Sequence, residues 1–398
     1  MKRSFIISIV MGVLFIWAGF PQTGFSAPEE VWLRVGAPNP LSGPGAMWGE
    51  PCVRGVKIMA DIYNDQGGVK VGNKVYKFKV FPADTQYTAE GGKSAYEKLL
   101  SVDKCQFMVG DFSDAPVAIM SPISTEKKIV CLLGSTAIPA LAPEFPYVFR
   151  FSQDQNQKLD SLRIALKTLP IKTFFMPSSD DLRGRAQAKI NNEVVSSLGV
   201  KLLGEIFYNP KETNFAPVMT KVLATKPDLI YAGPPGHAAL QMKEAHMLGY
   251  KGYWVSTGSV VNLDQMIQIA GGKEAVENWI GPYEMIDCPI IKDSDKPLLL
   301  DIQTRYLREF KPPFEPLAWR YATGLQILKD AIVKAGSPDP DAVKHTLETE
   351  TFHTFLGEGK FTGLKTFGIA HQFSPTTIAA IVKNGKPQYL GTYKTVEP

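Results

Sequence analysis

The chain has 398 residues, a formal net charge of +4, 44% hydrophobic residues and 21% charged residues. A chain of this length is too long for one compact core, which predicts two domains. The small net charge, without a basic run interleaved with aromatic residues, argues against a nucleic-acid-binding protein.

Residues 1–27 have the composition of a secretory signal peptide. Two basic residues open the segment, residues 5–20 form a short apolar core, and small residues near Ser26 and Ala27 suit cleavage. An uncleaved membrane anchor is the alternative, although the apolar run is short for a span. No cysteine lies near this point, so no lipid anchor is expected. We therefore predict export to the periplasm.

Four cysteines are spread widely along the chain and form no CxxC pair: Cys52, Cys105, Cys131 and Cys288. Their spacing is not that of a zinc site, and no metal or other cofactor is expected. Export permits disulfides. Cys105 and Cys131 fall in or beside neighbouring predicted strands, so a bridge between them and two buried free thiols both remain open.

The opening of the mature chain predicts a strand, a loop, a helix and a second strand. Residues 31–37 and 76–84 alternate and are rich in β-formers, whereas residues 49–64 carry apolar side chains at helical spacing. Such a unit opens a parallel sheet. The loop at residues 38–48 lies at the carboxyl end of the first strand, where open α/β sheets bind ligands.

Strands and helices continue to alternate up to residue 137. Helices are expected at residues 89–100 and 115–126, and strands at residues 106–110 and 129–133, whereas residues 147–151 mark a change in the pattern. The alternation indicates right-handed crossovers and a parallel sheet. The polar loops at residues 111–114 and 134–137 therefore meet the first loop at one sheet edge.

A second unit of the same layout follows, and then a helical segment with two late strands. Its elements are helices at residues 160–169, 183–198, 215–225 and 237–248, strands at 172–176, 201–208, 228–232 and 252–255, helices at 297–310, 318–335 and 341–348, and strands at 357–361 and 378–383. The predicted fold class is α/β, with two Rossmann-like lobes built on parallel central sheets.

The opening segment also resembles a known family, the branched-chain amino-acid (Leu/Ile/Val) type of periplasmic solute-binding protein, which serves ABC importers. The residues that carry the resemblance are Asn39-Pro40-Leu41-Ser42-Gly43-Pro44, Trp48-Gly49, Gly55-Val56, Ala60, Asn64 and Gly67-Gly68. The resemblance continues nearly to the C-terminus. It implies a type I periplasmic-binding-protein fold, a membrane permease as partner, and a monomer.

The resemblance further implies a hinge of three chain crossings. They are expected near residues 149–153, 280–286 and 352–358. The first lobe then comprises residues 28–151 with 284–354, and the second lobe comprises residues 152–283 with 355–398.

Patterns of catalytic sites are missing from the sequence. Gly92-Lys93-Ser94 has the end of a P-loop, but Tyr87 stands where its first glycine is needed. The chain contains neither GxGxxG nor GxSxG. The five histidines form no HExxH pair, and we therefore expect a protein that is not an enzyme.

A ligand site is predicted from loop residues of the first lobe. Hydroxyl groups and backbone N–H groups at helix starts suit a carboxylate. In the resembling family, matching loops hold the ligand carboxylate and a matching tryptophan walls the pocket. Helix capping is the alternative role for Ser113 and Thr136, and core packing is the alternative for Trp48. The candidate residues are Trp48, Ser113, Asp114, Ser135, Thr136 and Ala137.

The second lobe departs from the family pattern for amino-acid ligands. Leu182 and Pro235 lie where that pattern has aromatic residues, and Thr257 lies near its acidic residue for the ligand ammonium. His237 follows a loop at the expected cleft, with a plain surface position as its alternative. The ligand therefore stays open between an amino acid, an organic or aromatic acid and an amide. A ligand sensor is the alternative to a transport receptor.

Overall fold

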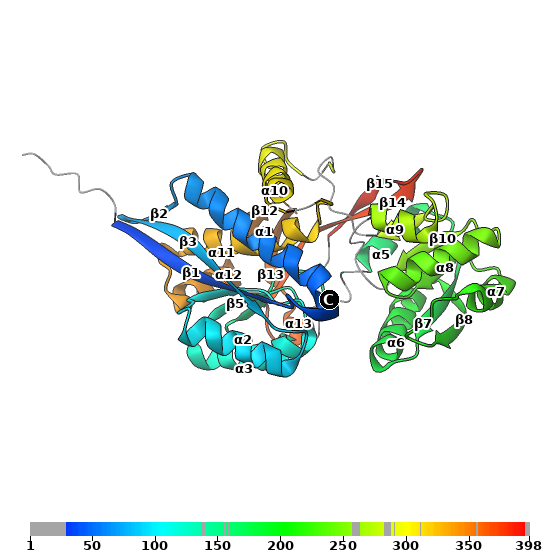
Figure 1. Ribbon diagram of the computed structural model, residues 1–398, viewed down its shortest axis with the longest axis horizontal. Helices are drawn as coiled ribbons and strands as arrows, with labels where there is room; N and C mark the ends of the chain where they lie inside the picture. The colour runs from blue at the N-terminus through cyan, green and yellow to red at the C-terminus, as the bar shows by residue number, and fades with distance from the viewer. Residues whose placement is uncertain are drawn as a thin grey trace, which may run out of the picture.

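The computed structural model describes residues 29–136, 140–154, 157, 159–256, 263–281, 288–289, 291–310, 312–355 and 357–394. The predicted signal peptide and the candidate residues Ala137 and Thr257 lie outside these ranges. The described elements form two groups, each built on a sheet with helices on both faces (Figure 1). This arrangement confirms the α/β prediction and its two mostly parallel sheets.

The first sheet has the strand order β2-β3-β1-β4-β5-β6. Its strands are β1 (Glu29–Asn39), β2 (Val69–Val71), β3 (Lys74–Asp84), β4 (Phe107–Val109), β5 (Val130–Leu133) and β6 (Val148–Arg150). β2 is antiparallel to β3, and the other neighbours in this order are parallel. Within β1 the alternating residues Leu33, Val35 and Ala37 are buried, whereas Trp32 is half exposed.

Helices cover both faces of this sheet. α2 (Ala89–Ser101) and α3 (Asp114–Lys127) lie on one face, and α1 (Ala46–Asp65) lies on the other with α11 (Leu317–Ala335) (Figure 1). Gly55 lets α1 and α11 approach closely, because a Cβ there would lie 2.0 Å from the Ala318 carbonyl oxygen.

The second sheet has the order β8-β7-β9-β10-β11, and these neighbours are parallel. Its elements are α5 (Asp160–Thr168), β7 (Thr173–Ser179), α6 (Leu182–Ser197), β8 (Lys201–Tyr208), α7 (Ala216–Ala224), β9 (Leu229–Ala232), α8 (Pro235–Met247), β10 (Tyr253–Ser256), α9 (Leu263–Ala270) and β11 (Trp279–Gly281). Two apolar clusters fill its two faces, one with α7, α8 and α9 and the other with α5 and α6.

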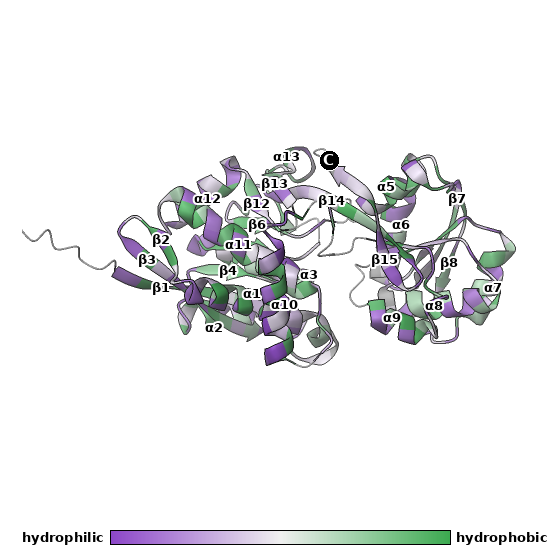
Figure 2. Cartoon of the chain, turned by 90° about the horizontal axis from the view of Figure 1, so that it is seen from above, coloured by the Kyte–Doolittle hydropathy of each residue, from purple (hydrophilic) through white to green (hydrophobic). Residues whose placement is uncertain are grey.

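One long strand joins the two sheets. β14 (Gln372–Lys383) pairs with β6 at Gln372, and its later residues pair antiparallel with β11 and with β15 (Lys386–Lys394). It runs from the first group of elements to the second (Figure 2). β14 therefore belongs to both sheets.

The pairing of the late strands differs from the sequence-based expectation. β13 (Gly357–Thr362) pairs with β12 (Phe352–Thr354) and with the first part of β14, next to β6. The expectation assigned residues 355–398 to the second lobe as a block. The pairing instead passes from the first sheet to the second within β14, because a single strand of 12 residues is long enough to reach both. The exact lobe boundaries stay a prediction.

Buried polar side chains fill the junction between β6 and β14. The Gln372 side-chain amide donates to the Ser152 carbonyl at 2.8 Å, and its oxygen accepts from the Arg150 guanidinium at 3.1 Å. Gln157 donates to Ser374 Oγ and accepts from Gln372. Since all of these residues are at least 95% buried, the network replaces water at the point where the chain passes between the sheets.

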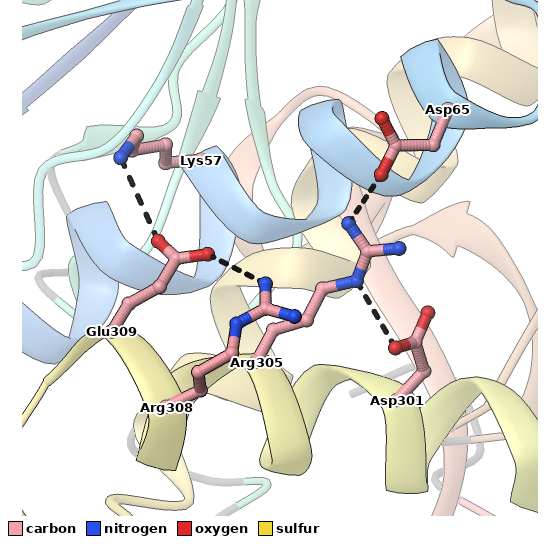
Figure 3. Close-up of polar contacts among 6 residues, drawn as sticks. All are labelled: Lys57, Asp65, Asp301, Arg305, Arg308 and Glu309. Carbon is pink, nitrogen blue, oxygen red and sulfur yellow. Dashed lines mark hydrogen bonds and ion pairs between the residues drawn. The ribbon is translucent and has the colours of Figure 1, made fainter.

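The helix α10 (Lys296–Glu309) follows the second predicted crossing and lies along α1 (Figure 3). Arg305 pairs with Asp65 of α1 at 2.6 Å and with Asp301 of its own helix at 3.0 Å. Glu309 faces Lys57 of α1 at 3.7 Å and Arg308 at 3.3 Å. These pairs are partly exposed and each stabilises little, so they orient α10 rather than hold the core.

The remaining helices of the first group are α12 (Pro340–Thr349) and the short α13 (Leu364–Phe367). Hydrophilic stretches lie on outlying helices such as α12 and α7 (Figure 2). Among the described helices none is long and apolar enough to cross a membrane. Cys105 and Cys131 are two buried free thiols and form no disulfide bridge with each other.

Two element boundaries near the expected site were predicted wrongly. α1 begins at Ala46, so Trp48 lies in the first turn of a helix and not in a loop. β7 continues to Ser179, although Pro177 and two serines there indicated a loop. β9 pairs with β7 at Phe174 and Phe175, before Pro177, so the proline occupies a stretch where a missing N–H is tolerated.

We predict that Gln372→Met lowers the free energy of unfolding by about 1–3 kcal/mol, because it removes the amide that satisfies buried Arg150 and Ser152 groups. Urea unfolding measures this loss. The matched control is Gln388→Met, since Gln388 is an exposed glutamine of β15, and its effect should stay within about 0.5 kcal/mol. Equal effects of the two variants would contradict the role assigned to the network.

Candidate functional site

Three aromatic side chains meet at the carboxyl edge of the first sheet. Trp48 packs edge-to-face on Phe112, with 6.5 Å between ring centroids, and Phe112 packs on Tyr87 at 5.8 Å. They come from three different segments, after β1, β3 and β4. Trp48 and Phe112 are half-buried and Tyr87 is 38% exposed, so part of this apolar surface remains open to solvent.

Asp111 is the polar centre of this edge. Its buried Oδ1 accepts hydrogen bonds from the Ser113 backbone N–H at 2.8 Å and from the Ser113 hydroxyl at 2.7 Å. Its Oδ2 accepts a hydrogen bond of 2.5 Å from the Thr85 hydroxyl, and its backbone carbonyl accepts one from the Gly134 N–H. Burial raises the pKa of Asp111 to about 6, although the hydrogen bonds oppose this shift.

The predicted residue Ser113 takes the N-cap position of α3, but its side chain does not cap the helix. Its hydroxyl donates to Asp111 instead. The Ser113 side chain therefore does not take the alternative role of capping the helix. The hydroxyl oxygen keeps its acceptor lone pairs, while its single hydrogen is used by Asp111.

The predicted residues Asp114 and Ser135 lie together. The Ser135 hydroxyl donates to Asp114 Oδ1 at 2.8 Å, which links the loops after β4 and β5. Asp114 is exposed and begins α3, whereas Ser135 is buried. Thr136 is half-buried and follows directly. The structure thus brings Ser113, Asp114 and Ser135 to one place beside the aromatic group, as the strand-end argument predicts.

The loop after β1 is fixed from the neighbouring strand. The Leu41 and Gln86 N–H groups each donate to Asp84 Oδ1 at 2.8 Å. Burial acts to raise the pKa of Asp84, but hydrogen bonds from Ser42, Leu41 and Gln86 outweigh it and hold this pKa below its usual value. Asp84 therefore stays ionised and holds the loop that leads to Trp48.

A buried guanidinium lies at the end of β6, beside the same edge. Burial lowers the pKa of Arg150 to about 10, while the charges of Asp154 and Asp114 act in the opposite direction. Arg150 is thus still charged at neutral pH. It gives the first sheet edge a positive charge close to Asp114, in an interior where such charges are weakly screened.

At the carboxyl edge of the second sheet, His237 packs among aromatic residues. Its Nδ1 lies 3.2 Å from the Tyr208 hydroxyl, and its ring is 5.5 Å from that of Phe215. Burial lowers the pKa of His237, whereas Asp181 and Glu212 oppose this shift. The imidazole is therefore mostly neutral at pH 7 and can donate or accept a hydrogen bond.

The other second-sheet candidates stand at helix starts. Leu182 begins α6 and Pro235 begins α8. Asp181 caps α6 by accepting from the Gly184 N–H at 2.7 Å, and it also accepts from the Ser179 hydroxyl at 2.8 Å. Asp180 pairs with Arg185 at 2.6 Å. Both carboxylates that follow β7 are thus engaged in local contacts.

Sequence reasoning missed five residues of this site: Tyr87, Asp111, Phe112, Arg150 and Tyr208. All of them stand within three residues of a strand's carboxyl end. Position at a strand's carboxyl end is the signal that would have found them. The assignment of the candidate residues to a ligand site stays a prediction.

A surface hollow of about 500 Å³ lies elsewhere on the first group, between α1 and the strands β1 and β3. Its walls include Trp32, Lys57, Asp61 and Lys79, and no predicted site residue. It lies beside the middle of the strands and not at their carboxyl ends, where the predicted site residues of the first sheet lie.

The fold and this edge define a class of protein. Two parallel α/β sheets joined by a shared strand present aromatic surface, hydroxyl groups and helix starts at their carboxyl ends, which suits the holding of a small molecule. A comparison of the sequence with family models also points to a binding protein. The chain matches the periplasmic binding protein model over residues 33–386, and it therefore belongs to that family.

Curated relatives are similar over most of the chain. The Leu/Ile/Val-binding protein homolog 2 of Brucella abortus is 24% identical over 372 residues, covering 91% of this chain and 92% of the relative. The Leu/Ile/Val-binding protein homolog 3 of Brucella melitensis biotype 1 is 23% identical over 334 residues, covering 80% and 83%.

Solved structures share the fold. A branched-chain amino acid transporter substrate-binding protein from Streptococcus pneumoniae, in complex with isoleucine, superposes with a TM-score of 0.74 at 17% identity, covering 92% of this chain and all of that one. A solute-binding protein of an ABC transporter from R. palustris, in complex with benzoate, superposes with a TM-score of 0.71 at 18% identity, covering 91% and 96%.

Proposed function

We propose that this protein is the extracytoplasmic solute-binding receptor of an ABC importer. It captures a small ligand that bears a carboxylate, closes its two lobes over it, and delivers it to membrane permease subunits. Family membership, the composition of residues 1–27 and the names of the relatives support this proposal. Export places the receptor in the periplasm.

The observation that carries the proposal is the combination of apolar and polar groups at one edge. The Trp48–Phe112–Tyr87 aromatic group offers a wall for a hydrophobic side chain or ring. Beside it lie the start of α3, Ser135 and Thr136, whose N–H groups, together with the Thr136 hydroxyl, offer donors for a carboxylate. The Ser135 hydroxyl itself donates to Asp114. An apolar wall beside a few fixed donors is how a small amphipathic ligand is held.

The described carboxylates at the second sheet edge are already engaged in local contacts, which favours a ligand acid that has no ammonium group. Asp180 is paired with Arg185 and Asp181 caps α6, so an ammonium would have to displace one of these contacts. The exposed Asp114 accepts the Ser135 hydrogen bond at the first sheet edge, and its charge is balanced in part by Arg150. An aromatic acid fits this arrangement, and a branched-chain amino acid fits it if Asp114 receives the ammonium.

Calorimetric titration with isoleucine, leucine, benzoate and 4-hydroxybenzoate tests the proposal. We expect at least one of these ligands to bind at a single site. An Asp114→Asn variant then separates the two classes. It should weaken the binding of an amino acid by tenfold or more, since a charge-assisted hydrogen bond contributes about 1.5–3 kcal/mol. The affinity for an aromatic acid should stay equal or rise, because a nearby negative charge is removed. Failure of carboxylates of both classes to bind would contradict the proposal.

We predict that Trp48→Ala weakens the bound ligand by about 1–3 kcal/mol, because an aromatic contact surface is lost. The fold should persist, since Trp48 is only half-buried. Trp32→Ala is the matched control: this tryptophan is 48% exposed and lies near the amino end of β1, away from the site. Equal affinity of the Trp48 variant and the control would show that Trp48 has a structural role alone.

A further inference from the structure

The hydrogen bonds of Asp111 conflict with the role expected of Ser113. A serine hydroxyl has one hydrogen, and that of Ser113 is donated to Asp111 Oδ1 at 2.7 Å. A ligand carboxylate needs donors and repels a second carboxylate. An ionised Asp111 therefore both holds the Ser113 hydrogen and opposes an anion placed at the start of α3.

We propose that Asp111 is the positioning residue of the ligand site, and that it couples the capture of an anionic ligand to the uptake of one proton. This inference rests on the proposed function, because it requires a ligand carboxylate at the first sheet edge. A protonated Asp111 stays in contact with Thr85 and Ser113. Its carboxyl group then donates its own hydrogen to Ser113 Oγ. The hydroxyl hydrogen of Ser113 is thereby released from Asp111 and turns to the ligand.

Among the groups that surround it, Asp111 is the one that titrates between pH 5 and pH 8. Cys52 of α1, Cys131 of β5 and Tyr321 of α11 interact with it electrostatically. Burial raises the pKa of all three, that of Cys131 to about 12, so they stay neutral at pH 5–8. Its direct partners, Thr85 and Ser113, are hydroxyl groups that do not ionise in this range.

The direction of the pH dependence follows from the charges. The pKa of Asp111 is about 6 without ligand, and a bound anion raises it further because it disfavours the ionised carboxylate. The ligand carboxyl ordinarily ionises near pH 4, so it stays charged above pH 5. Affinity therefore rises as the pH falls from 8 toward 6 and levels off below, by about tenfold for each unit of pKa difference.

Benzoate and isoleucine titrations at pH 5.5, 6.5 and 8, each in two buffers of different ionisation enthalpy, test the proposal. The wild-type protein should bind more tightly at pH 5.5 and take up a fraction of a proton near pH 6.5. Asp111→Asn keeps the shape of the side chain but cannot ionise, so it should bind with little pH dependence and no proton uptake. Circular dichroism verifies that the variant is folded.

Asp228→Asn is the matched control. Asp228 also accepts several hydrogen bonds, from the backbone N–H groups of Lys172 and Thr173 and from the Thr173 hydroxyl. It lies, however, at the amino ends of the strands of the second sheet. Its variant should keep the wild-type pH profile. A wild-type affinity that is equal at pH 5.5 and pH 8, or a pH dependence that survives Asp111→Asn, would overturn the proposal.

A ligand-free measurement separates this proposal from the proposed function. Carbon-13 NMR of aspartate carboxyl groups should show one titration near pH 6 that Asp111→Asn removes, and its absence would overturn the assignment to Asp111. Failure of both probes to bind, with that titration present, would count against the proposed function and leave Asp111 as the titrating residue. Should Asp111→Asn not fold, Ser113→Ala should lose part of the gain in affinity at pH 5.5, because it removes the hydroxyl that Asp111 holds but keeps the charge of Asp111; an unchanged gain would overturn the role assigned to Ser113.

Discussion

The hydrogen bonds of Asp111 are the constraint on which the first sheet edge depends. One buried residue connects the segments that follow β3, β4 and β5, through Thr85, Ser113 and Gly134. A buried carboxylate is costly unless its oxygens are satisfied, so the three segments are held in place by the groups that satisfy it. Tyr87 and Phe112 of the aromatic group lie on segments that are fixed in this way, and Trp48 packs on Phe112.

Buried hydrogen bonds also hold the junction between the two sheets. β14 pairs with β6 at one end and with β11 further on, so any relative movement of the two sheets is borne by this strand and by the chain segments beside it. The polar network of Arg150, Gln157 and Gln372 is buried there. Hydrogen bonds that can be exchanged for others let a junction bend without the loss of a packed apolar core.

Much of the fold could be predicted from the sequence, because its strands and helices carry clear periodicity. β1, α2 and β8 lie within two residues of their predicted bounds. The short strands β2 and β12 were missed, since three residues are too few to show a period. The pairing of β13 with the first sheet was also missed, because it depends on where a long strand runs in space and not on local pattern.

The candidate site was predictable in part for a similar reason. Strand-end position brought Ser113, Asp114 and Ser135 together correctly, since parallel strands end at one edge. The roles of their side chains were not predictable, because they depend on partners far apart in sequence: Ser113 is engaged by Asp111, which Thr85 contacts from another loop. Phe112 was overlooked because a single aromatic residue in a polar loop gives no periodic signal.

The proposed receptor captures a small acid between the two groups of elements and releases it unchanged. Small-angle X-ray scattering with saturating ligand, combined with mass spectrometry of the recovered ligand, tests this behaviour most directly. A ligand that contacts both sheet edges favours a closed form, so the radius of gyration should fall while the ligand stays chemically intact. An unchanged scattering curve at saturation, or conversion of the ligand, would contradict the account.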